Sequence, residues 1–176
     1  MKVLMITTGW PTQTNPNSSP FIYRQYKFLK KYGIEVDVFH LQSNHNPINY
    51  LKGWIKVRKL MWNNSYTIIH AQWGHSATLA LPTKTPLIIT FRGMDLEGII
   101  NKNGNYSMYG RILIAVSKLT SKFADEIIVV SKSLGDKLKR KDYKVLPSGI
   151  DLDLFKPLDK LECRKRLGLP ANKKLI

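Results

Sequence analysis

The sequence predicts an α/β protein, a three-layer Rossmann-like domain with a parallel, doubly wound sheet. Three observations predict it. Short apolar runs alternate with helical patterns along the chain, and each run leads into a loop. The first run, Val3–Ile6, is continuously apolar, which is typical of a strand buried on both faces. The chain has 176 residues, 43% of them hydrophobic, which suits one domain with a substantial core.

The first 41 residues predict one βαβ unit. After the strand Val3–Ile6 and a polar loop, Phe21–Tyr32 carries apolar residues at helical spacing and ends at Gly33. Ile34–Leu41 then alternates as a second strand.

The rest of the chain continues the alternation. Further strands are expected at Thr67–His70, Pro86–Phe91, Glu126–Val130 and around Val145, and further helices at Tyr50–Trp62, Ser76–Leu81, Arg111–Phe123, Ser133–Lys141 and Leu158–Gly168. Residues 1–157 are therefore interpreted as the N-terminal domain, and residues 158–176 as a connector toward a C-terminal domain absent from the chain. The last two residues, Leu175 and Ile176, are interpreted as the opening of another strand.

The charge balance favours anionic partners. Twenty-eight Lys and Arg against twelve Asp and Glu give a net charge of +16, which suits phospholipid surfaces, lipid-linked diphosphates, nucleotide sugars or nucleic acid, and also a merely solvated basic face. No RNA- or DNA-binding module is recognisable. The single Cys163 excludes an internal disulfide framework and fits a reducing compartment. Because neither a secretory signal nor a run long enough to span a membrane is present, we expect a cytoplasmic protein.

Several common sites are disfavoured by the motifs. The loop after the first strand holds one glycine, Gly9, so neither the G-x-G-x-x-G dinucleotide fingerprint nor a P-loop is present. The four histidines, His40, His45, His70 and His75, lack a Cys or carboxylate cluster at ligand spacing, so we expect no metal site. In an open parallel sheet, ligands bind beyond the carboxyl ends of the strands, so the residues after each apolar run are the candidates.

Four segments carry a family resemblance. They are, in order, H-A-Q-W-G-H at 70–75, T-F-R-G-M-D at 90–95, I-I-V-V-S-K-S-L at 127–134 and V-L-P-S-G-I-D-L-D-L-F-K-P at 145–157. Together with the opening strand and loop, they resemble the N-terminal domain of group 1 (family 4) glycosyltransferases, which have the two-domain GT-B fold.

The resemblance implies a function. It implies the acceptor-binding domain of a retaining, hexosyltransferase-type enzyme that moves a sugar from a nucleotide diphosphate sugar to a glycan or glycolipid precursor in cell-surface polysaccharide biosynthesis. It implies no cofactor beyond that co-substrate, and no metal. In such enzymes the diphosphate is stabilised by Arg and Lys of the C-terminal domain, so we expect residues 1–176 alone to be inactive.

The resemblance also nominates site residues, without identifying a catalytic one. It places Gly9 near the donor diphosphate. Arg92 stands where histidine is usual; because Arg stays protonated, we expect it to bind substrate but not to act as a base. Asp95 is open to three interpretations: acceptor contact, a pair with Arg92, or a helix N-cap. The polar pair Arg24 and Gln25 is equally open between ligand contact and ordinary surface. The full set expected at the acceptor is Trp10, Trp73, His75, Arg92, Asp95, Ser131 and Gly149.

A basic, tryptophan-bearing helix is predicted at Tyr50–Trp62. Tyr50, Trp54, Val57 and Met61 fall on one stripe, and lysines fall on the opposite side. Such a helix is typical of a membrane-surface anchor, while the alternative is a helix that packs its Trp stripe on the sheet. The expected membrane-contacting residues are Lys52, Trp54, Lys56, Arg58, Lys59 and Trp62. The alternative function is therefore a non-catalytic module that binds anionic membrane, peripheral at the inner face of the cell membrane.

Overall fold

The computed structural model describes residues 1–42 and 46–174. Six parallel strands form one sheet in the order β2-β1-β3-β4-β5-β6, which confirms the predicted parallel α/β fold. The strands are β1 Lys2–Thr7, β2 Glu35–His40, β3 Ile68–Gln72, β4 Leu87–Phe91, β5 Glu126–Val129 and β6 Tyr143–Val145. His45, and the strand opening expected at Leu175 and Ile176, lie outside the described residues.

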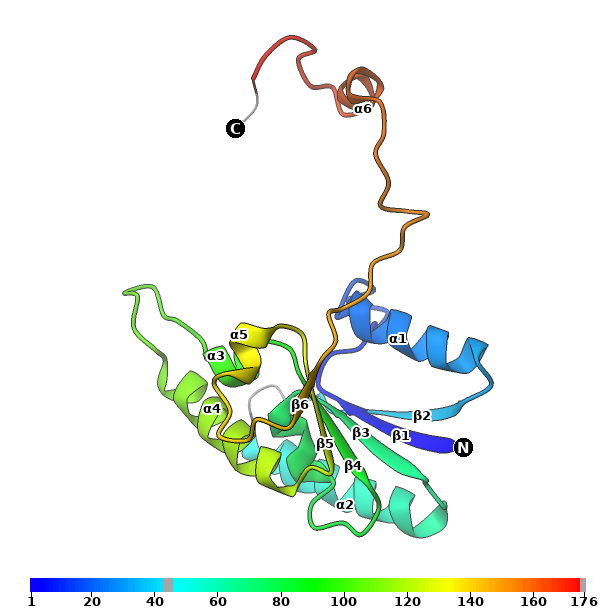
Figure 1. The fold of residues 1–176 in the computed structure, drawn as a ribbon, viewed down its shortest axis with the longest axis vertical. Coiled ribbons are helices and arrows are strands. Elements are labelled where there is room, and N and C mark those ends of the chain that lie inside the picture. Colours follow the sequence, from blue (N-terminus) through cyan, green and yellow to red (C-terminus); the bar gives the residue numbers. More distant parts are fainter. Residues whose placement is uncertain (43–45, 175–176) are drawn as a thin grey trace.

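Helices cover both faces of the sheet, but unequally (Figure 1). One face carries α1 (Pro20–Lys31), and the other carries α2 (Pro47–Asn63), the 3-10 helix η1 (Gly74–Leu79) and α4 (Met108–Thr120), which runs into η2 (Ser121–Phe123). Short helices α3 (Met94–Glu97) and α5 (Lys132–Gly135) follow β4 and β5.

The alternation of side chains along β1 explains the two-sided core. Val3 and Met5 face α1 and form a small cluster with Ile22, while Leu4 and Ile6 join the larger cluster on the opposite face. Because both faces of the central strands are buried, these strands are continuous apolar runs rather than alternating ones.

Two helical segments differ clearly from expectation in type or length, and one short helix was not predicted. The segment at 76–81 is the 3-10 helix η1 and begins earlier, at Gly74. The helix expected at Ser133–Lys141 is α5, which ends at Gly135, because the next turns close through i to i+3 bonds such as Leu138 N to Gly135 O. That tightening buries Leu138 and brings Arg140 to the carbonyls of Ser121 and Ala124. The short helix α3 was not predicted.

The last described segment leaves the sheet (Figure 1). After β6, residues 146–162 are exposed, and α6 (Lys160–Arg166) lies away from the sheet. The exposed side chains of residues 146–162 include large apolar ones, such as Leu152, Leu154 and Phe155. The division between a domain at 1–157 and a connector at 158–176 stays a prediction.

Close packing of α4 on the end of β3 depends on Gly74. A Cβ placed there would lie 2.6 Å from the Phe91 ring and 2.6 Å from Ser117 Cβ, both in the interior. The contact is reinforced by Thr120, whose hydroxyl donates to the Gly74 carbonyl at 2.9 Å.

We expect Gly74→Ala to lower the free energy of unfolding by about 1–3 kcal/mol, because Phe91 and α4 must move to admit the methyl group. Urea unfolding followed by circular dichroism measures it. Gly149→Ala is the matched control, since a Cβ at Gly149 meets nothing within 4 Å, and its effect should stay within about 0.5 kcal/mol. Equal effects of the two variants would contradict this account of the packing.

Candidate functional site

The candidate site lies at the carboxyl ends of the parallel strands. Loops that begin at Thr8 after β1, Trp73 after β3, Arg92 after β4 and Leu146 after β6 leave the sheet at this edge. The topological switch falls here too, because chain order reverses at β1, whose two neighbours are β2 and β3. Open α/β sheets bind their ligands at such a point.

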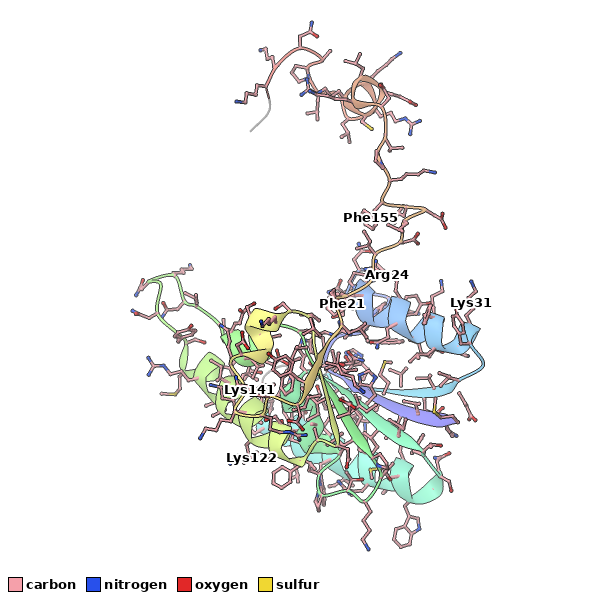
Figure 2. The ribbon with its side chains drawn as sticks, viewed as in Figure 1. Phe21, Arg24, Lys31, Lys122, Lys141 and Phe155 are labelled. Carbon is pink, nitrogen blue, oxygen red and sulfur yellow. The ribbon has the colours of Figure 1, made fainter. Side chains whose placement is uncertain are left out.

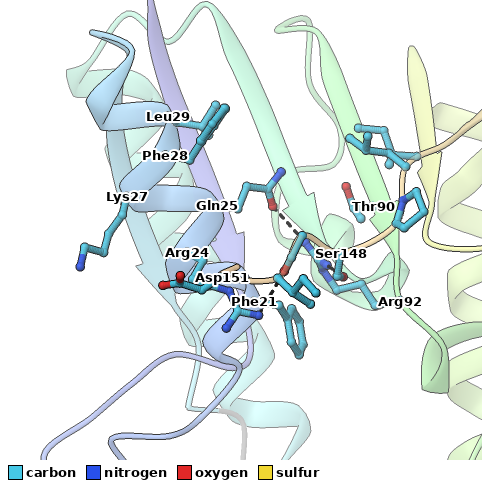
Figure 3. Close-up of a pocket in the computed structure, with 15 residues that line it drawn as sticks. Phe21, Arg24, Gln25, Lys27, Phe28, Leu29, Thr90, Arg92, Ser148 and Asp151 are labelled. Atoms are coloured by element: carbon cyan, nitrogen blue, oxygen red, sulfur yellow. Dashed lines mark hydrogen bonds between the residues drawn. The ribbon is translucent and has the colours of Figure 1, made fainter. Parts of the chain in front are cut away.

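Arg92 is the centre of the site (Figure 3). Its guanidinium donates to Gln72 Oε1, Gln25 Oε1 and Ser148 Oγ, each at 2.9 Å. These partners come from β3, α1 and the segment after β6. Arg92 therefore links three parts of the chain that are far apart in sequence.

The environment of Arg92 preserves its charge. Its guanidinium lies over the Phe21 ring, 4.8 Å from the centroid. Burial lowers the pKa of Arg92 to about 10, and the nearby Asp95 carboxylate acts in the opposite direction. Arg92 therefore remains cationic at neutral pH.

A cavity of about 720 Å³ opens beside Arg92, between α1 and the segment that follows β6. Its lining combines a polar end near Arg92 and Arg24 with apolar walls (Figure 3). The apolar wall includes Phe21, Phe28, Leu29, Ile128, Leu146 and Ile150. The volume suits a sugar-sized or larger ligand.

A buried polar chain supports Arg92 from below. Gln72, fully buried, donates from Nε2 to Gln25 Oε1 at 3.0 Å while its Oε1 accepts from Arg92. His70 Nε2 lies 2.7 Å from Thr90 Oγ1. Burial, with the positive charge of Arg92, lowers the pKa of His70 to about 4, so the imidazole is neutral at pH 7.

Asp95 is a buried hydrogen-bond acceptor with a structural role. Its carboxylate accepts from the backbone N–H of Arg92 at 3.2 Å, Gly93 at 2.9 Å and Gly74 at 3.1 Å, and the residue is fully buried. Burial raises the pKa of Asp95, while these hydrogen bonds act against the rise. The N-cap interpretation is wrong, because Gly93 holds the N-cap position of α3 and Asp95 lies inside its first turn. From there the Asp95 carboxylate fixes the turn that carries Arg92.

Gly9 and Trp73 are packed against each other behind the rim. A Cβ at Gly9 would lie 2.8 Å from the Trp73 ring and 2.2 Å from Ser19 Oγ, so any larger residue would displace both side chains. The Gly9 N–H donates to Thr7 Oγ1 at 3.2 Å. Trp73 is 8% exposed and has a φ of +72°, unusual for a residue with a side chain.

The other predicted acceptor residues are spread along the rim. Trp10 packs edge-on against Tyr23 and Tyr26 of α1. His75 Nε2 lies 3.2 Å from Thr8 Oγ1, and burial lowers the pKa of His75 to about 4. Ser131 caps α5 by accepting from Leu134 N.

Gly149 stays exposed in the cavity lining, and its carbonyl accepts from Arg24 at 3.2 Å. Of the predicted acceptor-binding residues, Arg92 and Gly149 line the cavity. The sequence nominated Gly9, Trp10, Trp73, His75, Asp95 and Ser131 as well, and none of these lines it. Gln72 and Ser148 were not in the predicted acceptor set, although Gln72 ends β3 and Ser148 follows β6, and a position at a strand end is the signal that identifies them.

In α2, the predicted membrane-contacting set divides into two groups. Trp54 Nε1 donates to the Leu81 carbonyl at 2.8 Å, and Arg58 donates to the carbonyls of Ala80 and Pro82 while lying over the Trp54 ring. Trp54 and Arg58 therefore fasten α2 to the loop before β4. The others, Lys52, Lys56, Lys59 and Trp62, are exposed.

The described residues hold neither a metal-binding cluster nor a helix that could span a membrane. Within residues 1–42 and 46–174, no three His, Cys, Asp or Glu residues gather closely enough to hold a metal ion. Over the same residues, the helices are too short or too polar to cross a bilayer.

The fold and the cationic rim define the class of protein, a Rossmann-like domain of the kind found in GT-B glycosyltransferases. Among solved structures, the sucrose-phosphate synthase of Thermosynechococcus elongatus superposes with a TM-score of 0.72 at 16% identity, over 97% of this chain and 53% of that one. Anabaena HepE, solved in complex with UDP and glucose, superposes with a TM-score of 0.51 at 18% identity, over 96% of this chain and 50% of that one.

The chain belongs to glycosyltransferase family 4, whose model matches residues 3–154. The putative teichuronic acid biosynthesis glycosyltransferase TuaC of Bacillus subtilis (strain 168) is 25% identical over an alignment of 228 residues, covering 99% of this chain and 57% of TuaC. The chain thus spans about half the length of the relatives it matches. The family predicted from the sequence motifs is confirmed.

Neutral, buried His70 should make stability depend on pH. The unfolded chain protonates this residue near pH 6.5, while the folded protein resists protonation until about pH 4. Between these values the unfolded state binds more protons, so the unfolding free energy falls with falling pH by about 1.4 kcal/mol per pH unit for such a histidine. His75, whose pKa is also lowered by burial, adds to this fall in the unfolding free energy.

Urea unfolding between pH 6.5 and about pH 4 measures this slope. His70→Gln should flatten it, because glutamine does not titrate. His40→Gln is the control, since His40 is less buried and carries a smaller share of the slope. A slope unchanged in His70→Gln would show that the imidazole is protonated in the folded protein.

Proposed function

We propose that this chain is the acceptor-binding domain of a retaining glycosyltransferase. It works with a nucleotide diphosphate sugar as donor and a glycan or glycolipid precursor as acceptor, in cell-surface polysaccharide biosynthesis. The observation that carries the proposal is the geometry of Arg92. A permanent cation is fixed at the strand-end rim and faces a cavity large enough for a sugar.

Arg92 retains capacity for a ligand. A guanidinium has five N–H groups, and three of those of Arg92 donate to Gln25, Gln72 and Ser148. Two remain for a substrate oxygen. Since arginine does not give up its proton at neutral pH, the role assigned to it is to bind and orient a phosphate, carboxylate or hydroxyl, and no proton transfer is assigned.

The cavity walls suit the rest of an acceptor. The ring of Phe21 and the side chains of Leu29 and Ile128 offer an apolar surface to the faces of sugar rings or to a lipid chain. Arg24, held by the Gly149 carbonyl, adds a second cation at the same end. Such a site favours an acceptor with an anionic group beside an apolar or sugar surface.

Two relatives support the assignment of substrates. HepE was solved with UDP and glucose, which supports a nucleotide sugar donor. TuaC is named for teichuronic acid biosynthesis, which supports a cell-surface polysaccharide as product. The groups that stabilise the departing diphosphate are assigned to the domain that the relatives carry beyond the matched half.

We expect residues 1–176 alone to bind UDP-glucose weakly and to transfer no sugar. Electrostatic stabilisation of the charge that develops in the transition state usually contributes most to an enzyme's rate enhancement, and the proposal assigns it to the second domain. Isothermal titration calorimetry measures the binding, and release of UDP with a lipid-linked glycan acceptor measures turnover. Sugar transfer by this chain in isolation would contradict the proposal.

In a polypeptide that continues into a donor-binding domain, we expect Arg92→Gln to lower kcat/KM about 10- to 100-fold. This corresponds to the loss of a charge-assisted hydrogen bond worth about 1.5–3 kcal/mol. Arg92→Lys keeps the charge but loses the planar arrangement of N–H donors. Its kcat/KM should lie between that of Arg92→Gln and that of the unmodified protein.

Lys31→Gln is the matched control, because it removes the same charge from an exposed position on α1 outside the cavity lining (Figure 2). Its kcat/KM should be unchanged. The midpoint of thermal unfolding of each variant shows whether a lower kcat/KM comes from a lost substrate contact or from a protein that no longer folds. If folded Arg92→Gln and Arg92→Lys kept full kcat/KM, Arg92 would not contact the substrate.

A further inference from the structure

The outward surface of α2 carries a second apolar stripe, distinct from the Trp54 stripe that sequence periodicity identifies. Ile48, Leu51, Ile55 and Trp62 recur at helical spacing and are 45–91% exposed, with Trp62 the most exposed. The inward side, by contrast, buries Gly53 and Val57 against Leu41 and Leu79.

The outward surface of α4 and η2 repeats this arrangement. Met108, Ile112, Leu119 and Phe123 are 53–80% exposed, while Leu113 and Ser117 face inward. Both helices contact η1 and cover the same face of the sheet, opposite α1 (Figure 1). The two stripes therefore belong to one side of the molecule, which we call the α2/α4 surface.

Cations border both stripes. Six of them are exposed, and neither helix contributes an Asp or Glu, since residues 47–63 and 108–123 contain none. In the part of the chain that the structure describes, none of the six has an acidic side chain within 4.0 Å. They are Lys52, Lys56, Lys59, Arg111, Lys118 and Lys122.

Because the helices run antiparallel to the strands, Trp62 and Phe123 both lie toward the edge of the sheet opposite the candidate site. The cavity, lined by α1, opens on the other face. Contact through the α2/α4 surface would therefore leave the cavity uncovered. Figure 2 shows the separation, with Lys122 on one side of the sheet and Phe21, Arg24 and Lys31 on the other.

We propose that the α2/α4 surface docks this domain on an anionic phospholipid bilayer. Exposed Trp, Ile and Leu beside lysines match the interfacial region of a bilayer, where apolar side chains enter the acyl boundary and ammonium groups reach the headgroups. Protein interfaces are depleted in lysine at their centres, and nucleic acid offers little to long apolar stripes. The docking is independent of the proposed sugar transfer.

Vesicle co-sedimentation of the 176-residue chain tests the docking. We expect binding to equimolar phosphatidylglycerol and phosphatidylcholine, and little binding to phosphatidylcholine alone. Each lysine near an anionic surface contributes roughly fivefold to the partition coefficient. The triple variant Lys52→Glu, Lys56→Glu, Lys59→Glu should therefore bind at least about 100-fold more weakly.

The matched control is Lys27→Glu, Lys30→Glu, Lys31→Glu on α1, which makes the same change in net charge on the opposite face. It should bind far more tightly than the α2 variant. Equal losses in the two triple variants would show a nonspecific charge effect and overturn the proposal. Binding that persists in the α2 triple variant, or is equal on both vesicles, would overturn it too.

Insertion is tested by fluorescence of Trp62. Its emission should shift to the blue on anionic vesicles and be quenched by brominated lipid, and Trp62→Phe should lose that response. In a Trp62→Phe background, Phe123→Trp should regain it if α4 docks beside α2. Absence of both responses, or self-association without vesicle binding, would assign the surface to a protein partner and overturn the proposal. Sugar transfer retained by the same variants in a polypeptide that continues into a donor-binding domain would leave the proposed function standing.

Discussion

The burial of the Arg92 guanidinium is the constraint on which the site depends. A guanidinium taken out of water is costly unless its N–H groups find acceptors, and here Gln72, Gln25 and Ser148 provide them. Those acceptors lie on β3, on α1 and after β6, so each must fold into place for the charge to be satisfied. The sheet, the helix that covers it and the segment leaving β6 are thus held in one arrangement by a residue that also faces the ligand cavity.

The turn beneath Arg92 is fixed by a second buried charge centre. Asp95 gathers backbone N–H groups from both sides of the rim, the Gly74 amide after β3 and the Arg92 and Gly93 amides after β4. Neutral His70 and Thr90 complete the interior below them. The site therefore rests on fixed hydrogen bonds between adjacent strand ends, which is how a rigid scaffold presents groups to a substrate without reorganising.

The strands and the family were readable from the sequence, while much of the site was not. Continuous apolar runs such as Val3–Ile6 identify buried parallel strands because burial on both faces leaves no polar position. Arg92 was identified because it follows a strand in a recognisable motif. Periodicity could not separate the two apolar stripes of α2, because it does not show that Trp54, although 36% exposed, donates its indole N–H to the Leu81 carbonyl and so binds α2 to the loop before β4. Nor could spacing show that the Asp95 carboxylate is occupied by backbone amides, since local bonding depends on the turn actually formed.

The contact between Gly9 and Trp73 has a consequence for how these positions can vary. Trp73 carries the cost of a left-handed backbone, which a glycine there would relieve, yet its ring occupies the space that a side chain at position 9 would need. Replacing the indole with a smaller group would free that space on one side, while the Ser19 hydroxyl, 2.2 Å from the same Cβ, would also have to turn away. Positions 9 and 73 should therefore vary together, so that a larger residue at position 9 is tolerated only with a smaller residue at position 73.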